Sequence, residues 1–434
     1  MAFFLHGVHV PHRKNSAGKT AHRMDIPASV TIPCAMHIGA PAKPVVKAGD
    51  LVKVGTLIAE QNGFVSSPVY ASVSGKVTKV DDIILSNGKT APAVTIESDG
   101  LMEKDESITA PEVNSKEDFI EAIKKSGIVG LGGAGFPTYV KFNVPDGKVD
   151  TLVINGAECE PYITSDTITM CERAEDMARA IEATIKYIGV SRVVIGIENN
   201  KKEAIENMKA LAERFAEMEV KVLPAIYPQG GEKVLVFHTV GRVIPAGKLP
   251  ADVGCIVANC TTMAAIGKYL DDGMPLVEKC ITVDGGAVKE NANVIAPIGT
   301  AFVDVINAAG GLKSKPAKVL SGGPMMGISV PDVNYPVLKN TNAIIAMSEK
   351  EAEPPVETSC ISCGACANHC PLRLDPAVYA KAYQHGDMDT LRKMRVDICM
   401  ECGCCSYICP AKRPLVHYNK MAKEALRELD AKKQ

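Results

Sequence analysis

The chain has 434 residues, 46% of them apolar, and a formal net charge of −2. This length exceeds what one compact core serves, so several domains are expected, and the near-neutral charge and absence of tryptophan argue against a nucleic-acid-binding surface. No apolar run reaches the roughly 18 residues of a membrane-spanning helix, and the first residues lack the features of a secretory signal. We therefore expect a protein of the reducing cytosol.

Residues 1–100 are predicted to form a β domain. Two halves, 43–60 and 66–81, each pair a Val-x-Val strand with a glycine turn. This arrangement resembles the biotinyl/lipoyl-type barrel-sandwich. That family carries its cofactor on a lysine at a hairpin tip, whereas the corresponding residues here, 61–64, contain none. We expect a docking or structural barrel without a swinging arm.

Residues 112–270 are predicted to form a Rossmann-like α/β domain. A helix at 117–125 precedes a glycine cluster, and strands at 151–154, 193–197 and 220–223 alternate with helices, of which the second is expected over 201–218. A β-α-β-α-β order indicates a parallel sheet with right-handed crossovers.

Two further domains complete a multidomain α/β plus β architecture. Residues 271–346 combine short strands with one short helix and are predicted to form a small β-grasp unit. Residues 356–434 follow a proline-containing linker and are predicted to be helical, with one helix expected over 377–394.

Nine of the fifteen cysteines lie in this last domain, and eight of them form two copies of one motif, C-x2-C-x2-C-x3-C-P. In two-cluster ferredoxins three cysteines of such a run bind one [4Fe-4S] cluster and the fourth binds the other. One predicted ligand set is Cys360, Cys363, Cys366 and Cys409; the other is Cys399, Cys402, Cys405 and Cys370. Paired zinc sites are the alternative, but they do not explain two terminal Cys-Pro pairs. Cys404 is expected to be a buried thiol or a neighbour of a cluster.

The glycine cluster formally matches G-x-G-x-x-G over residues 130–135. A helix precedes it where the dinucleotide fingerprint requires a strand, so the match alone is weak. Glycines nevertheless let a backbone approach a phosphate closely. Lys141 could add a positive charge, and Asn155 and Glu158 follow the first strand at the edge where open α/β sheets bind ligands.

Four segments resemble the NADH-binding flavoprotein subunit of respiratory complex I: GLGGAGFPTYVKF, NGAECEP, YPQGGEK and IVANCTT, at residues 130–142, 155–161, 227–233 and 256–262. The resemblance implies FMN as cofactor and NADH as substrate. It assigns to FMN Gly132, Gly133, Gly135, Lys141, Asn155, Glu158 and Asn259. It places Tyr227, Gly230 and Glu232 at the border of flavin and nicotinamide.

In its order of domains the whole chain is similar to the RnfC family, the C subunits of the Rnf electron-transport complex. HGVHVPHRK at residues 6–14 and SGGPMMG at 321–327 extend the similarity to the barrel and to an SLBB-like β-grasp unit. The resemblance implies a peripheral subunit at the cytoplasmic face of the bacterial membrane. It would pass electrons from NADH through FMN and the clusters to membrane and iron–sulfur partner subunits, with ferredoxin as an indirect partner and no acid/base catalytic residue.

Two alternatives remain open at this point. Cobalamin (corrinoid) reductases of bacterial microcompartments contain similar modules, but in that family the flavin domain comes first and the barrel last. A non-enzymatic iron–sulfur adaptor is the other alternative. It is favoured by Gly231 and Ala258, which stand where the complex I family has a second acidic residue and another asparagine.

Overall fold

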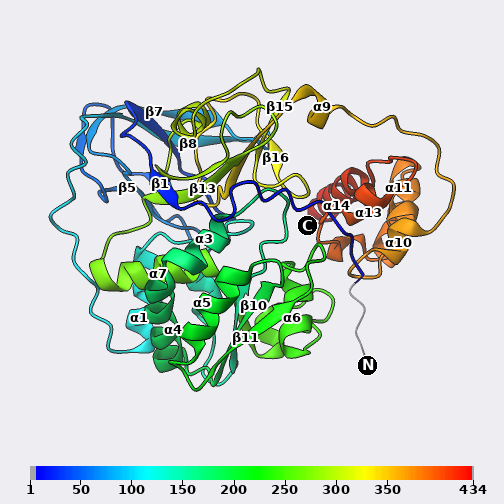
Figure 1. The fold of residues 1–434 in the computed structure, drawn as a ribbon, viewed down its shortest axis with the longest axis horizontal. Coiled ribbons are helices and arrows are strands. Elements are labelled where there is room, and N and C mark those ends of the chain that lie inside the picture. Colours follow the sequence, from blue (N-terminus) through cyan, green and yellow to red (C-terminus); the bar gives the residue numbers. More distant parts are fainter. Residues whose placement is uncertain (1–5, 433–434) are drawn as a thin grey trace.

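The computed structural model describes residues 6–432, in which three groups of β-strands and one group of helices are packed together (Figure 1). The first group forms two antiparallel sheets that enclose an apolar core. One sheet has the strand order β2-β8-β7-β4, and its strands are β2 (Ser29–Pro33), β8 (Thr90–Ser98), β7 (Gly75–Ile84) and β4 (Leu51–Val52). The other contains β3 (Lys43–Pro44), β5 (Leu57–Glu60) and β6 (Val69–Tyr70).

Alternation of apolar and polar residues builds this barrel-sandwich. Val30 and Ile32 of β2 face the core together with Val94 and Ile96 of β8, because every second side chain of a strand points to the same face. The tip at residues 61–64 contacts the next domain through Gln61, whose amide lies 2.8 Å from the hydroxyl of Tyr139.

The second group is a four-stranded sheet in which all neighbours are parallel, as the sequence predicts. Its order is β11-β10-β9-β12, with β9 (Thr151–Gly156), β10 (Arg192–Glu198), β11 (Met218–Leu223) and β12 (Cys255–Asn259). One face carries helices α1 (Lys116–Lys125), α4 (Ala174–Ile188), α5 (Lys202–Ala212) and α7 (Cys260–Asp272). The other face packs against α6 (Glu232–Val240), and α2 (Thr138–Phe142) and α3 (Ser165–Glu172) border the sheet.

The prediction of a helix over 201–218 was too long. Helix α5 ends at Ala212, Phe215 packs partly buried against the core, and Met218 already pairs with Val193 as the first residue of β11. Strand pairing and core packing at residues 215–218 therefore outweigh the helical preference of the sequence.

The third group is a six-stranded mixed sheet with the order β1-β14-β13-β17-β15-β16. Its strands are β1 (Ala21–Arg23), β13 (Glu278–Asp284), β14 (Ala292–Pro297), β15 (Lys318–Ser321), β16 (Ile328–Ser329) and β17 (Ala343–Met347), and α8 (Phe302–Ala308) covers its core. Strand β1 comes from the N-terminal segment and pairs in parallel with β14. The N-terminal segment thus joins the sheet of residues 278–347, and the strands of the barrel begin at β2.

Up to residue 432, where the described part of the chain ends, the last domain has helices and no strand, and it lies beside the other three (Figure 1). After the single turn α9 (Glu349–Ala352) and an exposed linker come α10 (Ala365–Asn368), α11 (Pro376–Gln384), α12 (Met388–Lys393), α13 (Cys404–Ile408) and α14 (Leu415–Ala431). The expected single helix over 377–394 is broken, because Gly386 adopts a φ of +69° and the chain turns there.

The N-terminal segment crosses the molecule from this helical domain to the third sheet (Figure 1). Val8 forms a β-bridge with Tyr227, Lys14 reaches the loop after β9, and Ala21 begins β1. Within residues 6–432, no helix is both long and apolar enough to cross a bilayer.

Candidate functional site

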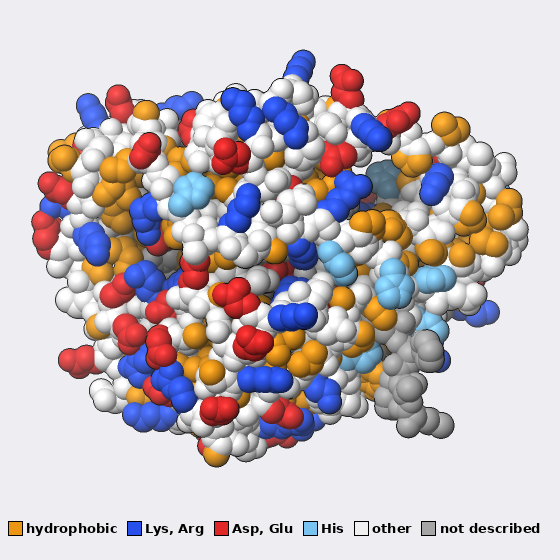
Figure 2. All heavy atoms as spheres, in the orientation of Figure 1, with side chains coloured by type: hydrophobic (Ala, Val, Ile, Leu, Met, Phe, Trp, Pro, Cys, Tyr) orange, Lys and Arg blue, Asp and Glu red, His pale blue; other side chains and the backbone are white. Residues whose placement is uncertain are grey.

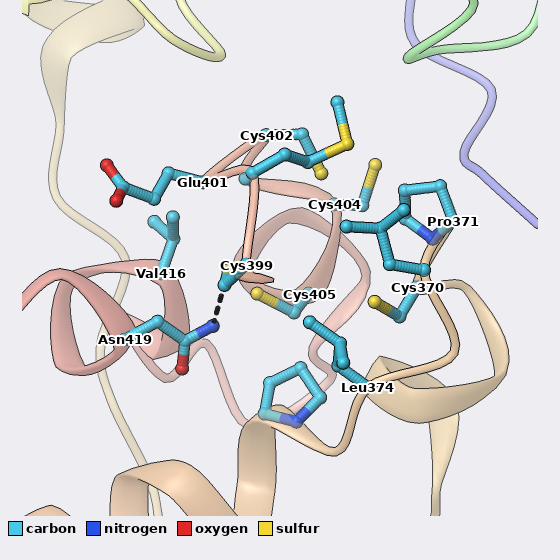
Figure 3. Close-up of a pocket in the computed structure, with 14 residues that line it drawn as sticks. Cys370, Pro371, Leu374, Cys399, Glu401, Cys402, Cys404, Cys405, Val416 and Asn419 are labelled. Atoms are coloured by element: carbon cyan, nitrogen blue, oxygen red, sulfur yellow. Dashed lines mark hydrogen bonds between the residues drawn. The ribbon is translucent and has the colours of Figure 1, made fainter. Parts of the chain in front are cut away.

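Two cavities in the helical domain are lined by the eight motif cysteines. The inner cavity is lined by Cys399, Cys402 and Cys405 of the second motif together with Cys370 of the first (Figure 3). The outer cavity is lined by Cys360, Cys363 and Cys366 together with Cys409. Each motif thus contributes three cysteines to one cavity and its Cys-Pro cysteine to the other.

The donor chemistry of both cavities fits an iron–sulfur cubane. The four motif thiols on the largely apolar wall of each cavity match the four cysteine thiolates that hold a [4Fe-4S] cluster. Burial raises the pKa of the Cys405 thiol, which favours its protonated form. Because a metal binds the thiolate, metal binding would release this proton.

Two polar side chains of α14 contact Cys399 at the wall of the inner cavity. The side-chain amide of Asn419, which is 1% exposed, donates a hydrogen bond to the sulfur of Cys399 at 3.4 Å (Figure 3). Lys423 binds the carbonyl oxygen of Cys399 at 2.9 Å. Both residues lie on α14, one turn apart, which brings them to the same helix face.

Cys404 is a buried thiol, as expected, and it borders the inner cavity. Its sulfur lies 3.8 Å from the carbonyl oxygen of Tyr227 in the α/β domain. Cys404 therefore belongs to the contact between the two domains.

The carboxyl ends of β9 and β12 form the centre of a second candidate site. The chain builds β9, β10 and β11 outward in one direction and then returns to place β12 on the opposite side of β9. This is a topological switch point, where open α/β sheets bind ligands. Asn155 and Asn259 are register partners at the ends of these two strands.

The glycine turn, residues 130–135, lies directly against Asn259. A Cβ atom on Gly132 would come within 2.4 Å of the Asn259 amide, so any larger residue there would displace the Asn259 side chain. The backbone of residues 132–134 is exposed, and a Cβ on Gly133 would meet nothing within 4 Å. This bare backbone beside a switch point is a cradle suited to a phosphate group.

The sequence did not reveal which residues would order this cradle. The Oδ1 atom of Asn259 caps α7 by accepting hydrogen bonds from the amides of Thr261 and Thr262, and its Nδ2 donates to the buried Asp166 at 2.7 Å. The hydroxyl of Thr262 accepts a hydrogen bond from the amide of Leu131 at 3.0 Å. Asp166 belongs to none of the sequence motifs and lies within α3, so nothing in the sequence indicated that it contacts Asn259.

Two residues predicted for different cofactor parts form an ion pair. Nζ of Lys141 on α2 lies 3.0 Å from Oε2 of Glu232, the first residue of α6. Nearby, the amide of Asn155 donates to the carbonyl oxygen of Gly230 at 2.9 Å. The structure therefore joins the predicted flavin residues to the segment 227–233.

The side chain of Glu158 points to the start of α3 and not to the glycine turn. The buried carboxylate of Glu158 accepts hydrogen bonds from the amide of Asp166 and the hydroxyl of Thr167 at the start of α3. Burial raises the pKa of Glu158 and lowers that of Lys14, which donates to the carbonyl oxygen of Glu158. Glu158 thus holds the loop after β9 in shape.

Tyr227 connects the two candidate sites. Its hydroxyl, buried with the rest of the side chain, donates to the carbonyl oxygen of Cys402 at 2.7 Å. Four residues later, a Cβ on Gly231 would lie 2.3 Å from the end of the Met400 side chain. The segment 227–231 therefore packs against the wall of the inner cavity.

Family profiles match four parts of the chain. They are the RnfC barrel sandwich hybrid domain at residues 2–101, the Nuo51 FMN-binding domain at 123–268, the SLBB domain at 280–329 and a 4Fe-4S dicluster domain at 359–413. The cofactors implied by these domains are FMN and [4Fe-4S] clusters, as the sequence predicts.

Solved structures share the fold. An NAD+-reducing [NiFe]-hydrogenase in the H2-reduced state superposes with a TM-score of 0.50 and 18% sequence identity over 72% of this chain and 63% of that one.

Curated relatives cover nearly the whole chain. The C subunit of the Na+-translocating ferredoxin:NAD+ oxidoreductase complex of Acetobacterium woodii is 43% identical over 98% of this chain and 97% of its own length. The proton-translocating counterpart of Clostridium ljungdahlii is 42% identical over 86% of this chain and 83% of its own length. The corresponding subunit of the ion-translocating oxidoreductase complex of Rhodobacter capsulatus is 38% identical over 98% of this chain and 84% of its own length. The chain belongs to the RnfC family.

Proposed function

We propose that the chain is the peripheral subunit of an ion-translocating ferredoxin:NAD+ oxidoreductase complex that exchanges electrons with NADH. Its relatives are subunits of such complexes, and its domains are those of FMN and [4Fe-4S] proteins. FMN, when bound, exchanges a hydride with nicotinamide and single electrons with iron–sulfur clusters.

One observation carries this proposal: the segment 227–231 touches both candidate cofactor sites. Gly230 accepts a hydrogen bond from Asn155 at the switch point, while Tyr227 donates to Cys402 at the inner cavity. A site for two-electron chemistry and a site for one-electron chemistry thus share a wall, which shortens the path that electrons must cross.

The proposed FMN site combines the cradle with nearby side chains. Backbone amides of the glycine turn, Gly132, Gly133 and Gly135, would hold the phosphate, with Lys141 as the neighbouring cation. Asn155 and Asn259 would bind polar edges of the cofactor at the switch point, and Glu158 would act by fixing the loop after β9. Glu232 and Gly230 would border the nicotinamide, whereas the buried Tyr227 would align the two domains.

The proposed ligand sets give the clusters an order. The set Cys399, Cys402, Cys405 and Cys370 adjoins the α/β domain and would take electrons first. The set Cys360, Cys363, Cys366 and Cys409 would follow, and Cys360 and Cys363 are exposed, which suits transfer to a partner protein. The partners would be membrane and iron–sulfur subunits of the complex, with ferredoxin connected through them, and the protein would lie at the cytoplasmic face.

The test is an analysis of anaerobically purified full-length protein for iron, sulfide and flavin. About eight irons and one FMN per chain are expected from two cubanes and one flavin site. Zinc in place of iron, or no flavin in protein that is otherwise folded, would refute the proposal.

A second measurement separates this function from an iron–sulfur adaptor without a nicotinamide site. NADH added to the protein under argon should bleach the visible absorbance of the oxidised flavin at about one to two NADH per chain, because the flavin accepts two electrons and the two clusters accept one each. Gly231, which packs against Met400, and Ala258 are the two residues that favour the adaptor. An adaptor would retain its clusters, bleach no flavin and reduce no dye with NADH.

A further inference from the structure

The glycine turn is surrounded by residues from two other domains. The tight turn at residues 338–341, just before β17, is closed by reciprocal hydrogen bonds between Leu338 and Thr341. Its two tip residues, Lys339 and Asn340, point to the segment that contains the proposed cradle.

Lys339 fixes the segment before the cradle. Its side chain is fully buried, and its Nζ donates to the carbonyl oxygens of Gly127 at 2.7 Å and Pro68 at 2.6 Å and to the hydroxyl of Ser67 at 3.1 Å. In its protonated form the amino group has three donors for these three acceptors. One side chain therefore joins the barrel, the β-grasp unit and the α/β domain at the start of the turn.

Asn340 fixes the cradle itself. Its Nδ2 donates to the carbonyl oxygen of Gly133 at 3.0 Å. In a trans peptide the C=O and the following N–H point in opposite directions. A bond that holds the Gly133 carbonyl toward Asn340 thus directs the amide of Ala134 to the opposite side of the turn.

The barrel holds the far end of the turn in the same way. The amide of Ile38 donates to the carbonyl oxygen of Gly135 at 3.1 Å. Gly135 has a φ of +71°, and a Cβ there would lie 3.1 Å from the carbonyl oxygen of Met36. Three carbonyls of the segment, at residues 127, 133 and 135, are therefore each bound by a donor from another domain.

We propose that Lys339 and Asn340 are positioning residues for the flavin site, which they serve by fixing the peptide planes of the glycine turn from the β-grasp domain. This rests on the proposed FMN site. Since the α/β domain does not orient these peptides alone, FMN affinity depends on the docking of its neighbours. The β-grasp unit thus takes part in cofactor binding without touching the cofactor.

The experiment measures FMN affinity on the full-length chain, stripped of flavin but with its clusters intact, by quenching of FMN fluorescence. Asn340→Ala should weaken binding about fivefold, the equivalent of one ordinary hydrogen bond. Asn340→Asp, which cannot donate when ionised and faces a carbonyl, should weaken it at least as much. Asn334→Ala is the matched control, because Asn334 belongs to the same domain and its side chain forms no part of the turn at residues 338–341. It should stay within twofold of the parent.

Lys141→Ala distinguishes failure of this inference from failure of the FMN site. If Lys141→Ala weakens FMN while Asn340→Ala stays within twofold of the parent, the positioning role is refuted and the site stands. If neither variant weakens FMN, both are refuted. Unfolding midpoints measured in parallel complete the test, because a purely structural role of Asn340 would lower the midpoint and leave the Kd unchanged at temperatures far below it.

Discussion

The amide of Asn419 donates a hydrogen bond to the sulfur of Cys399, from the second turn of α14 to the wall of the inner cavity. Hydrogen bonds to cluster sulfurs stabilise the reduced, more negative state and raise the reduction potential. Asn419→Ala should therefore lower the potential of the inner cluster by about 40 mV, the equivalent of about 1 kcal/mol for one electron. EPR-monitored redox titration measures it.

The outer cluster of the same protein is the internal control for this variant. Its potential should stay within the error of the titration, since Asn419 lines only the inner cavity. An equal shift of both clusters, or no shift of either, would contradict a local effect of this amide.

The proposed ligand sets predict that replacing a ligand cysteine lowers the iron content, whereas replacing the non-ligand Cys404 does not. Cys360→Ala should leave about four irons per chain in place of about eight, because the outer cluster loses a ligand. Cys404→Ala should keep about eight, since the sulfur of Cys404 contacts the Tyr227 carbonyl in the α/β domain. Iron and sulfide analysis checks both, and loss of iron from Cys404→Ala would make the proposed ligand set wrong.

Lys141 and Glu232 should affect different parameters although they form an ion pair. Lys141→Ala should weaken FMN binding about tenfold or more, the range of a charge-assisted hydrogen bond. Glu232→Gln should raise KM for NADH and leave the FMN content near the parent value. The ion pair is partly exposed and itself contributes at most about 1 kcal/mol, so neither variant should unfold the protein.

Steady-state kinetics with an artificial acceptor, together with flavin analysis, separates these two roles. If both variants lost FMN and left KM unchanged, the assignment of Glu232 to the nicotinamide side would be wrong.

Tyr227 should matter for the contact between domains. Tyr227→Phe removes the buried hydrogen bond to the Cys402 carbonyl and should cost about 1 kcal/mol of docking free energy. Proteolysis of the exposed linker at residues 353–359 should become faster. Tyr407→Phe is the matched control, because Tyr407 is 42% exposed. An unchanged cleavage rate in Tyr227→Phe would show that this bond does not secure the helical domain.

Lys339 should give the protein a specific dependence on pH. Burial lowers its pKa from 10.5 to about 7, with the nearby Cys34 opposing part of this effect. Between these values the unfolded chain binds a proton that the folded chain does not, so stability rises with pH. Relative to Lys339→Met, the parent protein should gain up to about 1.4 kcal/mol per pH unit from pH 7 to 9.

The two titratable groups that face Lys339 do not interfere in this range. Burial, with Lys339 itself, lowers the pKa of His37 to about 4, and burial raises the pKa of Cys34 to about 12. Unfolding midpoints of both proteins over pH 7–9 provide the measurement. A constant difference between them would mean that Lys339 keeps its proton throughout.

The sequence by itself determined the parts that depend on local spacing. Two cysteine motifs, a glycine cluster and the alternation of helices and strands predicted a helical iron–sulfur domain and a parallel sheet, because neighbouring residues share a turn or a strand face. The helix over 201–218 and the helix over 377–394 were wrong where strand pairing at Met218 and the turn at Gly386 took over.

Only the tertiary structure decided how these parts meet. Asn340 and Gly133 are 207 residues apart, and Tyr227 and Cys402 are 175 apart. Strand β1 joins β14 from the other end of the chain. The face drawn in the space-filling view carries interspersed basic and acidic side chains, and this distribution does not mark where one domain ends and the next begins (Figure 2). Such contacts arise when separate faces bury each other, and no periodicity within a segment records which distant partner covers it. For this reason the iron–sulfur chemistry could be predicted from cysteine spacing and FMN from a family resemblance, whereas the domain contacts that fix the glycine turn and align the inner cavity could not be predicted from the sequence.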